Sequence, residues 1–321
     1  MIFGDIAVLL NLLSIMAFSA FFIVYILAIV IRFTSERINQ YAAFSRRQLL
    51  WIVVLSPWLV SLIAATLAIL SGTQYTLFPQ SYNLLHWHHA DEFAFFSWHG
   101  FSTIAAIIFV SILVIKNIFR MVRNEHQLSL LHALAEPDNK GFYQLDADAA
   151  MAFTAGYLKP RCYITSGLRT HLNDKELEII GLHEKAHARY FDPIKKALFK
   201  FLTAFFPFGI SKKLYQSMSL TMEQCADLAV TRKTADKSTV ALTLLKVRRL
   251  VVQPFENIKN NTVICHYAFD NIEARIGYIL SEQKYKKLPI FAISLLTIFM
   301  TLACALSADV FHHVIEYSLS H

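Results

Sequence analysis

His183-Glu184-Lys185-Ala186-His187 (HEKAH) is the stretch of sequence from which the fold and the chemistry of this chain can be predicted. Two histidines four residues apart lie on one face of a helix, so both imidazoles can bind the same metal ion. The glutamate between them would then lie beside an open coordination position, where a general base is needed. The pattern predicts a zinc-binding helix with His183 and His187 as ligands and Glu184 as the catalytic base.

A second pattern, Glu223-Gln224-Cys225-Ala226-Asp227, supplies the remaining groups of such a site. Zinc in hydrolases typically has three protein ligands and one exchangeable water, and Glu223 is the candidate for the third ligand. Asp227, one helical turn later, is suited to hold the second ring nitrogen of a ligand histidine. Asp192, which follows the first helix, is a candidate for the same role or for capping a neighbouring segment. We therefore expect one Zn²⁺ ion per chain.

The alternative explanation is that His183 and His187 are ordinary helix residues, because the chain contains 13 histidines. The surrounding sequence argues against this explanation. A typical helix N-cap, Asn173 or Asp174, predicts a helix that contains both histidines and ends near residue 190. A second predicted helix, from about 219 to 233, places the two carboxylates of the second pattern one turn apart. The capped helix that contains both histidines and the two carboxylates one helical turn apart together favour the metal site.

The composition predicts a membrane protein. The chain has 321 residues, of which 55% are hydrophobic, and its mean hydropathy is +0.44. A transmembrane helix takes about 20 apolar residues, and four runs have that character. They cover about 6–31, 50–71, 101–119 and 289–308. The expected fold is a mainly α membrane protein with four transmembrane helices, the first three of which form a membrane domain at 1–119.

The positions of the basic residues predict the orientation in the membrane. All 30 lysines and arginines fall in two stretches, 32–47 and 116–287. Cytoplasmic segments of membrane proteins are enriched in these residues, so both stretches are expected inside. The N-terminus, the loop 72–100 and a short tail at 309–321 are expected outside. We therefore predict a bacterial inner-membrane protein with a cytosolic domain at 120–288.

The cytosolic part of the chain is expected to be an α+β domain. Residues 152–158 and 161–165 have the pattern of a β-hairpin just upstream of the metal-binding helix. Residues 197–210 are apolar but too short to span a bilayer, and a proline and a glycine interrupt them. A membrane-apposed segment and a buried core helix explain this stretch equally well. Residues 253–288 contain few informative features.

Several motifs follow one another in a fixed order along the chain. They are AFTAG at 152–156, KPR at 159–161, ITSGL at 164–168, HEKAH at 183–187, Asp192-Pro193, and Glu223 with Ala226-Asp227. This order resembles the BlaR/MecR-type integral-membrane zinc metallopeptidases, closely over about 150–235. The layout of three early spans, a cytosolic domain and a late span is also similar. The resemblance implies a zincin-like (gluzincin) fold with a small β-sheet. It also implies regulated proteolysis in signalling, with a cytosolic transcriptional repressor or the protease itself as substrate.

The resemblance does not extend to antibiotic sensing, and two other interpretations stay open. The β-lactam sensors of that family have a large penicillin-binding domain after the last span, and this sequence shows only the short tail there. Antibiotic sensing through such a domain is therefore not expected.

The first of the two other interpretations is the HtpX and CAAX-protease type. It shares the HExxH motif, the later glutamate and a preceding strand, and it implies a quality-control or processing protease. The third interpretation is a non-catalytic membrane receptor or scaffold with a structural metal site.

Candidate substrate contacts follow from the same motif. In HExxH enzymes an extended substrate commonly adds to an exposed strand. The candidate strand consists of Arg161, Cys162, Tyr163, Ile164 and Thr165, although these residues could also be ordinary sheet. Stabilisation of an oxyanion needs a hydrogen-bond donor near the metal. The candidates for this donor are Tyr190, Arg232 and His266.

The net charge of +7 does not require a nucleic-acid partner. A basic cytosolic surface beside anionic lipid headgroups accounts for it. We therefore expect membrane lipid and a protein or peptide substrate as partners, and no direct binding of nucleic acid. The four cysteines, at 162, 225, 265 and 304, form no CxxC pair and predict no structural disulfide. Nothing in the sequence indicates an oligomeric state.

Overall fold

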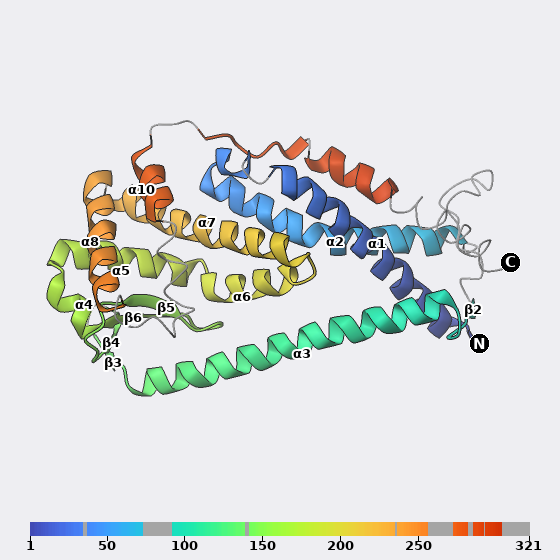
Figure 1. Ribbon diagram of the computed structural model, residues 1–321, viewed down its shortest axis with the longest axis horizontal. Coiled ribbons are helices and arrows are strands. Elements are labelled where there is room, and N and C mark those ends of the chain that lie inside the picture. The colour runs from blue at the N-terminus through green and yellow to red at the C-terminus, as the bar shows by residue number, and fades with distance from the viewer. Residues whose placement is uncertain are drawn as a thin grey trace.

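The computed structural model describes residues 1–34, 37–72, 92–138, 141–234, 236–255, 272–281, 285–291 and 293–303. Most of these residues are helical, and short strands form two small sheets (Figure 1). The larger sheet and several shorter helices gather at one end of an elongated molecule. Long helices extend from there to the end at which the N-terminus lies.

Among the described residues, three helices are long and apolar enough to cross a membrane. They are α1 (Asp5–Thr34), α2 (Ala43–Gly72) and α3 (Trp98–Ala133). The three N-terminal spans predicted from the sequence fall within these helices. Helices α1 and α2 pack closely, with Ile23 of α1 in one apolar cluster with Val60 and Ala64 of α2. The structure is therefore compatible with a helical membrane protein.

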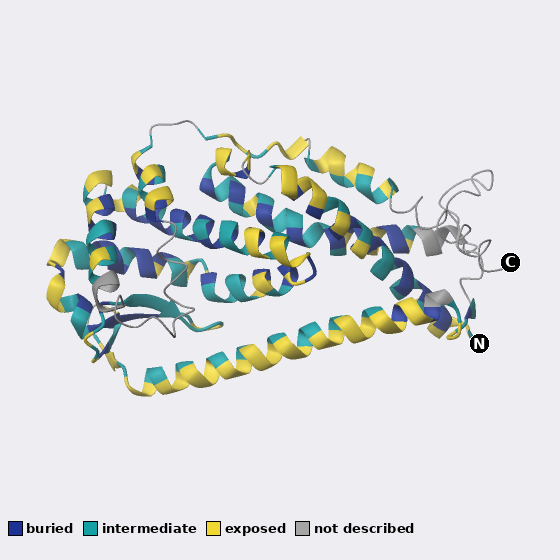
Figure 2. Ribbon diagram, in the orientation of Figure 1, coloured by how far each residue is buried: buried dark blue, intermediate teal, exposed yellow. Residues whose placement is uncertain are grey.

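Helix α3 is longer than one bilayer crossing requires. Its 36 residues extend about 54 Å at 1.5 Å per residue, whereas the hydrocarbon core of a bilayer is about 30 Å thick. Figure 2 shows that most of its length is exposed along one side of the molecule. Its C-terminal part reaches the larger sheet, where Asn124 Nδ2 donates to the Tyr157 hydroxyl at 2.9 Å. Helix α3 therefore continues about 14 residues beyond the predicted end of the third span at 119.

The fourth predicted span is represented by a short apolar helix, Ile293–Ala303. Residues 304–321, which include the rest of that span and the predicted outer tail, lie outside the described residues. Residues 73–91, most of the predicted outer loop, also lie outside them. The fourth span therefore stays a prediction.

The larger sheet contains the hairpin predicted upstream of the HExxH motif. Its strands are β3 (Glu136–Pro137), β4 (Tyr143–Leu145), β5 (Ala152–Ala155) and β6 (Arg161–Thr165). Their order is β3-β4-β6-β5, with β6 parallel to β4 and antiparallel to β5. Gly156 turns the hairpin with φ of +106°, and a Cβ there would lie 2.7 Å from the Lys159 carbonyl oxygen. Only glycine fits this turn without strain.

A second, two-stranded sheet was not predicted. It pairs β1 (Ile2–Phe3) with β2 (Glu92–Phe93) in antiparallel register. The strands have two residues each, too few for a recognisable alternation of apolar and polar residues. This sheet joins the start of α1 to the segment that precedes α3.

The HExxH motif lies on α5 (Asp174–Arg189), which follows the short helix α4 (Ser166–His171). Asn173 Oδ1 accepts a hydrogen bond from the Glu176 backbone N–H, and Glu176 Oε2 accepts one from the Asn173 N–H, both at 2.9 Å. This capping box confirms the predicted start of the helix. After α5 the chain turns through Phe191, which has φ of 53°. Asp192-Pro193 then begins the next helix.

The apolar stretch 197–210 forms the tip of a helical hairpin. Helix α6 (Asp192–Thr203) and helix α7 (Phe208–Thr234) are joined by a turn that contains Pro207. Phe199 is fully buried and contacts the Trp51 ring of α2 at 5.4 Å between centroids. Phe205 contacts Trp58 of α2 at 4.6 Å. The stretch is therefore core packing, but packing against a helix that is itself a candidate span. Helix α7 also begins 11 residues before the expected start at 219.

Two further helices cover α5 and α7. They are α8 (Lys237–Phe255) and α10 (Ile272–Leu280). A shared apolar cluster joins the four helices and consists of Ile179, Val230, Val240, Leu244, Ile272 and Ile279. Helix α10 was not predicted, because its nine residues lie in a stretch that we read as uninformative. It contributes directly to the candidate site described below.

Asn173→Ala is expected to destabilise the fold by about 1 kcal/mol, because the Glu176 backbone N–H at the start of α5 loses its acceptor. The measurement is thermal unfolding of the full chain in detergent micelles. Asn173→Asp preserves a side-chain acceptor and should unfold close to the parent temperature. Equal stability of Asn173→Ala and the parent would show that the cap does not hold α5.

Candidate metal centre

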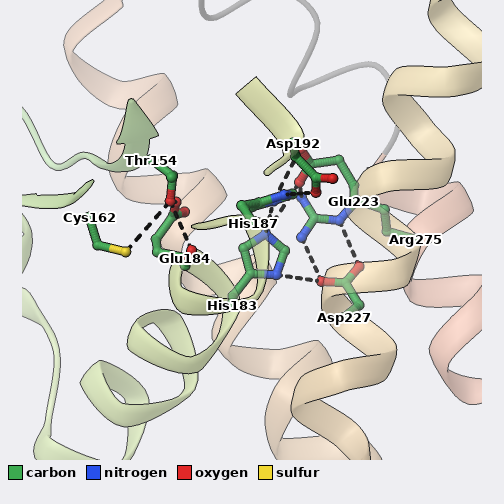
Figure 3. Close-up of polar contacts among 9 residues, drawn as sticks. All are labelled: Thr154, Cys162, His183, Glu184, His187, Asp192, Glu223, Asp227 and Arg275. Atoms are coloured by element: carbon green, nitrogen blue, oxygen red, sulfur yellow. Dashed lines mark hydrogen bonds and ion pairs between the residues drawn. The ribbon is translucent and has the colours of Figure 1, made fainter. Parts of the chain in front are cut away.

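Three potential ligands from two helices converge. His183 and His187 stand on α5, and Glu223 stands on α7 (Figure 3). The two Nε2 atoms are 3.1 Å apart. Glu223 Oε2 lies 3.3 Å from His183 Nε2, and Glu223 Oε1 lies 3.6 Å from His187 Nε2. All these residues can offer ligand atoms within 4.8 Å of one another, so the group could hold a metal ion.

The separations fit a tetrahedral divalent cation. Ligand atoms about 2.0–2.1 Å from such an ion lie about 3.3 Å from one another, close to the three distances observed. The outer ring nitrogens, Nδ1, of both histidines face carboxylates, so the Nε2 lone pairs point into the shared space. Two such lone pairs and a carboxylate repel one another unless a cation lies among them. The residues present therefore fit a metal ion.

Two buried carboxylates hold the ligand histidines. Asp227 Oδ1 lies 3.1 Å from His183 Nδ1, and Asp192 Oδ2 lies 2.7 Å from His187 Nδ1. Both aspartates are at least 95% buried. The structure thus places each aspartate against a ligand histidine, as the sequence analysis expected of them. A carboxylate on Nδ1 fixes the ring orientation and leaves Nε2 free to bind a metal.

Arg275 on α10 also contacts the candidate ligands, and it was not predicted from the sequence. Its Nη1 lies 3.1 Å from Glu223 Oε2, and its Nε and Nη2 donate to the two oxygens of Asp227 at 2.9 and 2.7 Å. Burial alone would lower the pKa of Arg275, but Asp227 and Glu223 outweigh burial and raise it. Burial would raise the pKa of Glu223, yet Arg275 is first among the groups that hold it well below its usual value. Arg275 therefore positions Glu223 and keeps it ionised.

A signal for Arg275 was present in the sequence. Ile272, Ile276 and Ile279 recur at helical spacing, which predicts an amphipathic helix. In such a helix Arg275, three residues after Ile272 and four before Ile279, would lie on the same face as the isoleucines. Which carboxylates the guanidinium meets depends on the packing of α10 against α7, and that packing has no local signature.

The ionisation of the two histidines reflects their carboxylate neighbours. Burial alone would lower the pKa of His183, but Asp227 and Glu223 outweigh burial and raise it above 6.5. Burial would also lower the pKa of His187, but Glu223 and Asp192 raise it well above 6.5. Without a metal, a proton therefore favours the space among the ligands. A metal ion must displace it.

The candidate base is tied to the sheet. Glu184 is 8% exposed, and its side chain points away from the two histidines toward β5 (Figure 3). The Thr154 hydroxyl lies 2.7 Å from Glu184 Oε2 and 2.9 Å from the Glu184 carbonyl oxygen, and can donate to either. Thr154 thereby links the position of Glu184 to strand β5. The hydrogen bonds of Thr154 therefore fix Glu184 relative to the terminal strand of the sheet.

The expectation that Arg161–Thr165 is an exposed edge strand is wrong. This segment is β6, which pairs with β4 on one side and β5 on the other. Its Cys162, Tyr163, Ile164 and Thr165 are all buried. A strand with both edges paired cannot accept a peptide. Among the described strands, β5 is the terminal strand nearest Glu184, so it replaces β6 as the candidate edge.

In the described part of the chain, the candidate oxyanion donors Tyr190 and Arg232 contact side chains at the start of α2. Arg47 of α2 stacks over the Tyr190 ring at 5.1 Å, and Tyr190 contacts Phe44 edge-on at 6.3 Å. The Arg232 guanidinium also lies over Phe44, at 5.3 Å. Both side chains therefore pack against the start of α2. His266 lies outside the described residues.

Cys225 is a packing residue and not a ligand. It is fully buried on α7, two residues after Glu223. Burial raises the pKa of its thiol to about 11. Metal binding requires the thiolate, so a neutral thiol in this position does not compete with the two imidazoles.

Comparison with protein-family models, with curated proteins and with solved structures finds no match to this chain. The assignment of a function therefore depends on the residues and their geometry.

The parent chain is expected to bind one divalent ion, and His187→Ala is expected to lose it, because two remaining ligands rarely retain a metal through purification. Elemental analysis of the purified full chain measures the ion. His126→Ala changes an exposed histidine of α3 and should leave the metal content unchanged. Metal retained by His187→Ala at parent stoichiometry would contradict this site.

Metal affinity is expected to fall as the pH is lowered through the raised pKa of the two histidines, because the ion must displace their protons. The fall should begin above pH 6.5, the ordinary histidine value. Glu223 and Asp227, whose pKa values are lowered, stay charged and do not contribute to it. Competition titrations of Co²⁺ between pH 5.5 and 8.5 measure the profile. A flat profile would refute the assignment of the histidines as ligands.

Proposed function

We propose that this chain is a membrane-bound zinc endopeptidase that hydrolyses a peptide bond of a protein substrate. One observation above all supports the proposal: His183, His187 and Glu223 converge from separate helices, and Glu184 lies between the two histidines in sequence. Two imidazoles and a carboxylate form the ligand set of one class of zinc peptidases. A general base on the metal-binding helix completes the requirement for hydrolysis.

The residues of the site divide the work of peptide hydrolysis among them. A bound zinc ion would polarise the scissile carbonyl and lower the pKa of a water. Glu184 would accept the proton of the attacking water and transfer it to the leaving amine. Thr154 orients Glu184 through its hydroxyl. The two aspartates hold the ligand rings, so that both Nε2 atoms stay free of protons at neutral pH when the ion is bound.

The substrate is proposed to bind as an extended strand beside β5. Addition of a peptide to a sheet edge uses main-chain hydrogen bonds and therefore accepts many sequences. Strand β5 carries Thr154, which contacts Glu184, so a peptide paired with β5 would lie next to the base. This arrangement favours an unfolded segment of a protein over a folded surface.

The proposed location is a bacterial inner membrane, with the N-terminus outside and the metal centre in the cytosol. The support is the distribution of basic residues, none of which lies at 1–31 or 48–115. Helix α7 contacts α2 through Arg46, close to the N-terminal end of that candidate span. The centre would then lie just beneath the inner leaflet.

The order of motifs, which resembles the BlaR/MecR-type peptidases, favours regulated signalling proteolysis. The substrate would be a cytosolic repressor or the protease itself. The alternative is a quality-control or processing protease of the HtpX and CAAX type. The two differ in the range of substrates, so comparison of cleavage products in cells with active and inactive enzyme separates them. Few products indicate signalling, and many indicate quality control.

Glu184→Gln is expected to lower the rate of cleavage by about 10²- to 10⁴-fold, while one metal ion stays bound. The amide has nearly the size of the carboxylate but cannot accept a proton from water. Metal content and cleavage of the chain's own peptide bonds or of added protein are measured together. Glu178→Gln, an exposed glutamate of the same helix, is the matched control and should retain activity.

Full activity of Glu184→Gln would reject the mechanism. A parent chain that binds metal but cleaves no protein would instead favour the third interpretation, a receptor or scaffold with a structural metal site.

A further inference from the structure

A buried arginine links the N-terminal end of α2 to the helix of the third ligand. Arg46 is 2% exposed. Its Nε donates to Thr221 Oγ1 of α7 at 2.8 Å, and its Nη2 donates to Gln224 Oε1, also on α7. Its Nη1 donates to Asn39 Oδ1 at 3.1 Å. Gln224 directly follows Glu223, so Arg46 holds the residue next to the ligand.

Gln224 extends this link to α10. Its Nε2 donates to the Ala274 carbonyl oxygen at 3.1 Å. Ala274 directly precedes Arg275, whose guanidinium contacts Glu223. One amide side chain therefore joins α2, α7 and α10. Gln224 is adjacent to Glu223 on α7, and its partner Ala274 is adjacent to Arg275 on α10.

The start of α2 also holds α10 and the following segment directly. The Ala43 backbone N–H donates to the Tyr278 hydroxyl of α10 at 2.8 Å. The Lys286 N–H donates to the Gln40 carbonyl oxygen at 3.0 Å, and the Ala42 N–H donates to the Lys286 carbonyl oxygen at 3.1 Å. Lys286 leads into the last apolar helix. The start of α2 is thereby attached to the helix that carries Arg275, and the residues just before α2 are attached to the segment that leads into the apolar helix.

We propose that Arg46 is a positioning residue that couples the N-terminal end of α2 to the metal centre through Gln224. Glu223 and Arg275 keep their arrangement only while α2, α7 and α10 are docked on this amide. A displacement of α2 relative to α7 would break the link and weaken the hold on the metal. The inference rests on the proposed metal centre, and it gives the membrane helices control over it.

Stability alone does not explain Arg46. Removal of a guanidinium from water is costly, and apolar residues of similar volume often stabilise a fold as well or better. The acceptors of Arg46 among the described residues are neutral oxygens of Asn39, Thr221 and Gln224. Three fixed donors at defined angles instead determine the relative position of two helices. Such geometry is what a link between a span and a ligand requires.

The test measures Co²⁺ affinity and the visible absorption spectrum of bound Co²⁺, with the full chain in lipid nanodiscs. Arg46→Gln is expected to bind Co²⁺ about tenfold more weakly and with an altered spectrum. Arg46→Lys should recover part of the affinity, because it restores the charge and one of the donors. Arg37→Gln removes the same charge from an exposed position just before α2 and should match the parent.

Gln224→Asn provides a second variant that retains the amide but shortens it by one methylene. It should weaken Co²⁺ binding to a similar extent, and the double variant with Arg46→Gln should lose little more than the weaker single variant, because one link is broken in each. Parent affinity and spectrum in Arg46→Gln or in Gln224→Asn would overturn the coupling. Additive losses in the double variant would also overturn it. A parent chain that binds Co²⁺ but cleaves nothing would reject only the proposed protease function.

Discussion

The structure depends on the electrostatic requirement that two imidazole nitrogens and a carboxylate share one small space. The Nε2 atoms of His183 and His187 are 3.1 Å apart, with Glu223 beside both. Lone pairs at this distance need a cation among them, whether a proton or a metal ion. Asp227 and Asp192 face the outer ring nitrogens and so prevent the rings from turning away.

The surrounding elements each hold one part of the centre. Helix α7 presents Glu223, α10 supplies Arg275 to hold its carboxylate, and β5 supplies Thr154 to hold Glu184. The α6–α7 hairpin packs against α2, so the ligand helix is also part of the core that contacts a candidate span. Arg46 at the start of α2 adds hydrogen bonds to Thr221 and Gln224 of α7. Under the proposed coupling, a metal ion held here would respond to the position of α2 as well as to its own ligands.

The features predicted correctly from the sequence have local signals, whereas those missed or predicted wrongly depend on how distant segments pack. The N-cap at Asn173 and the hairpin upstream of the HExxH motif have local signals, and the structure contains both. The role of Arg161–Thr165 depends on which strands pair on either side, and a strand buried in the sheet reads much like an edge strand in sequence. Arg275 is close to Glu223 only because α10 packs against α7, about 50 residues later in the chain.

The sequence by itself determined the spacing of the two histidines on one helical face, the following glutamate and aspartate, and three long apolar helices. These properties follow from helical periodicity and hydropathy, which act over a few residues to about 20. Only the tertiary structure decided that β6 is an inner strand, that 197–210 packs on α2, and that Arg275 and Arg46 converge on the ligand helix. Contacts between distant segments are selected by the fit of whole surfaces, which no short stretch of the chain encodes.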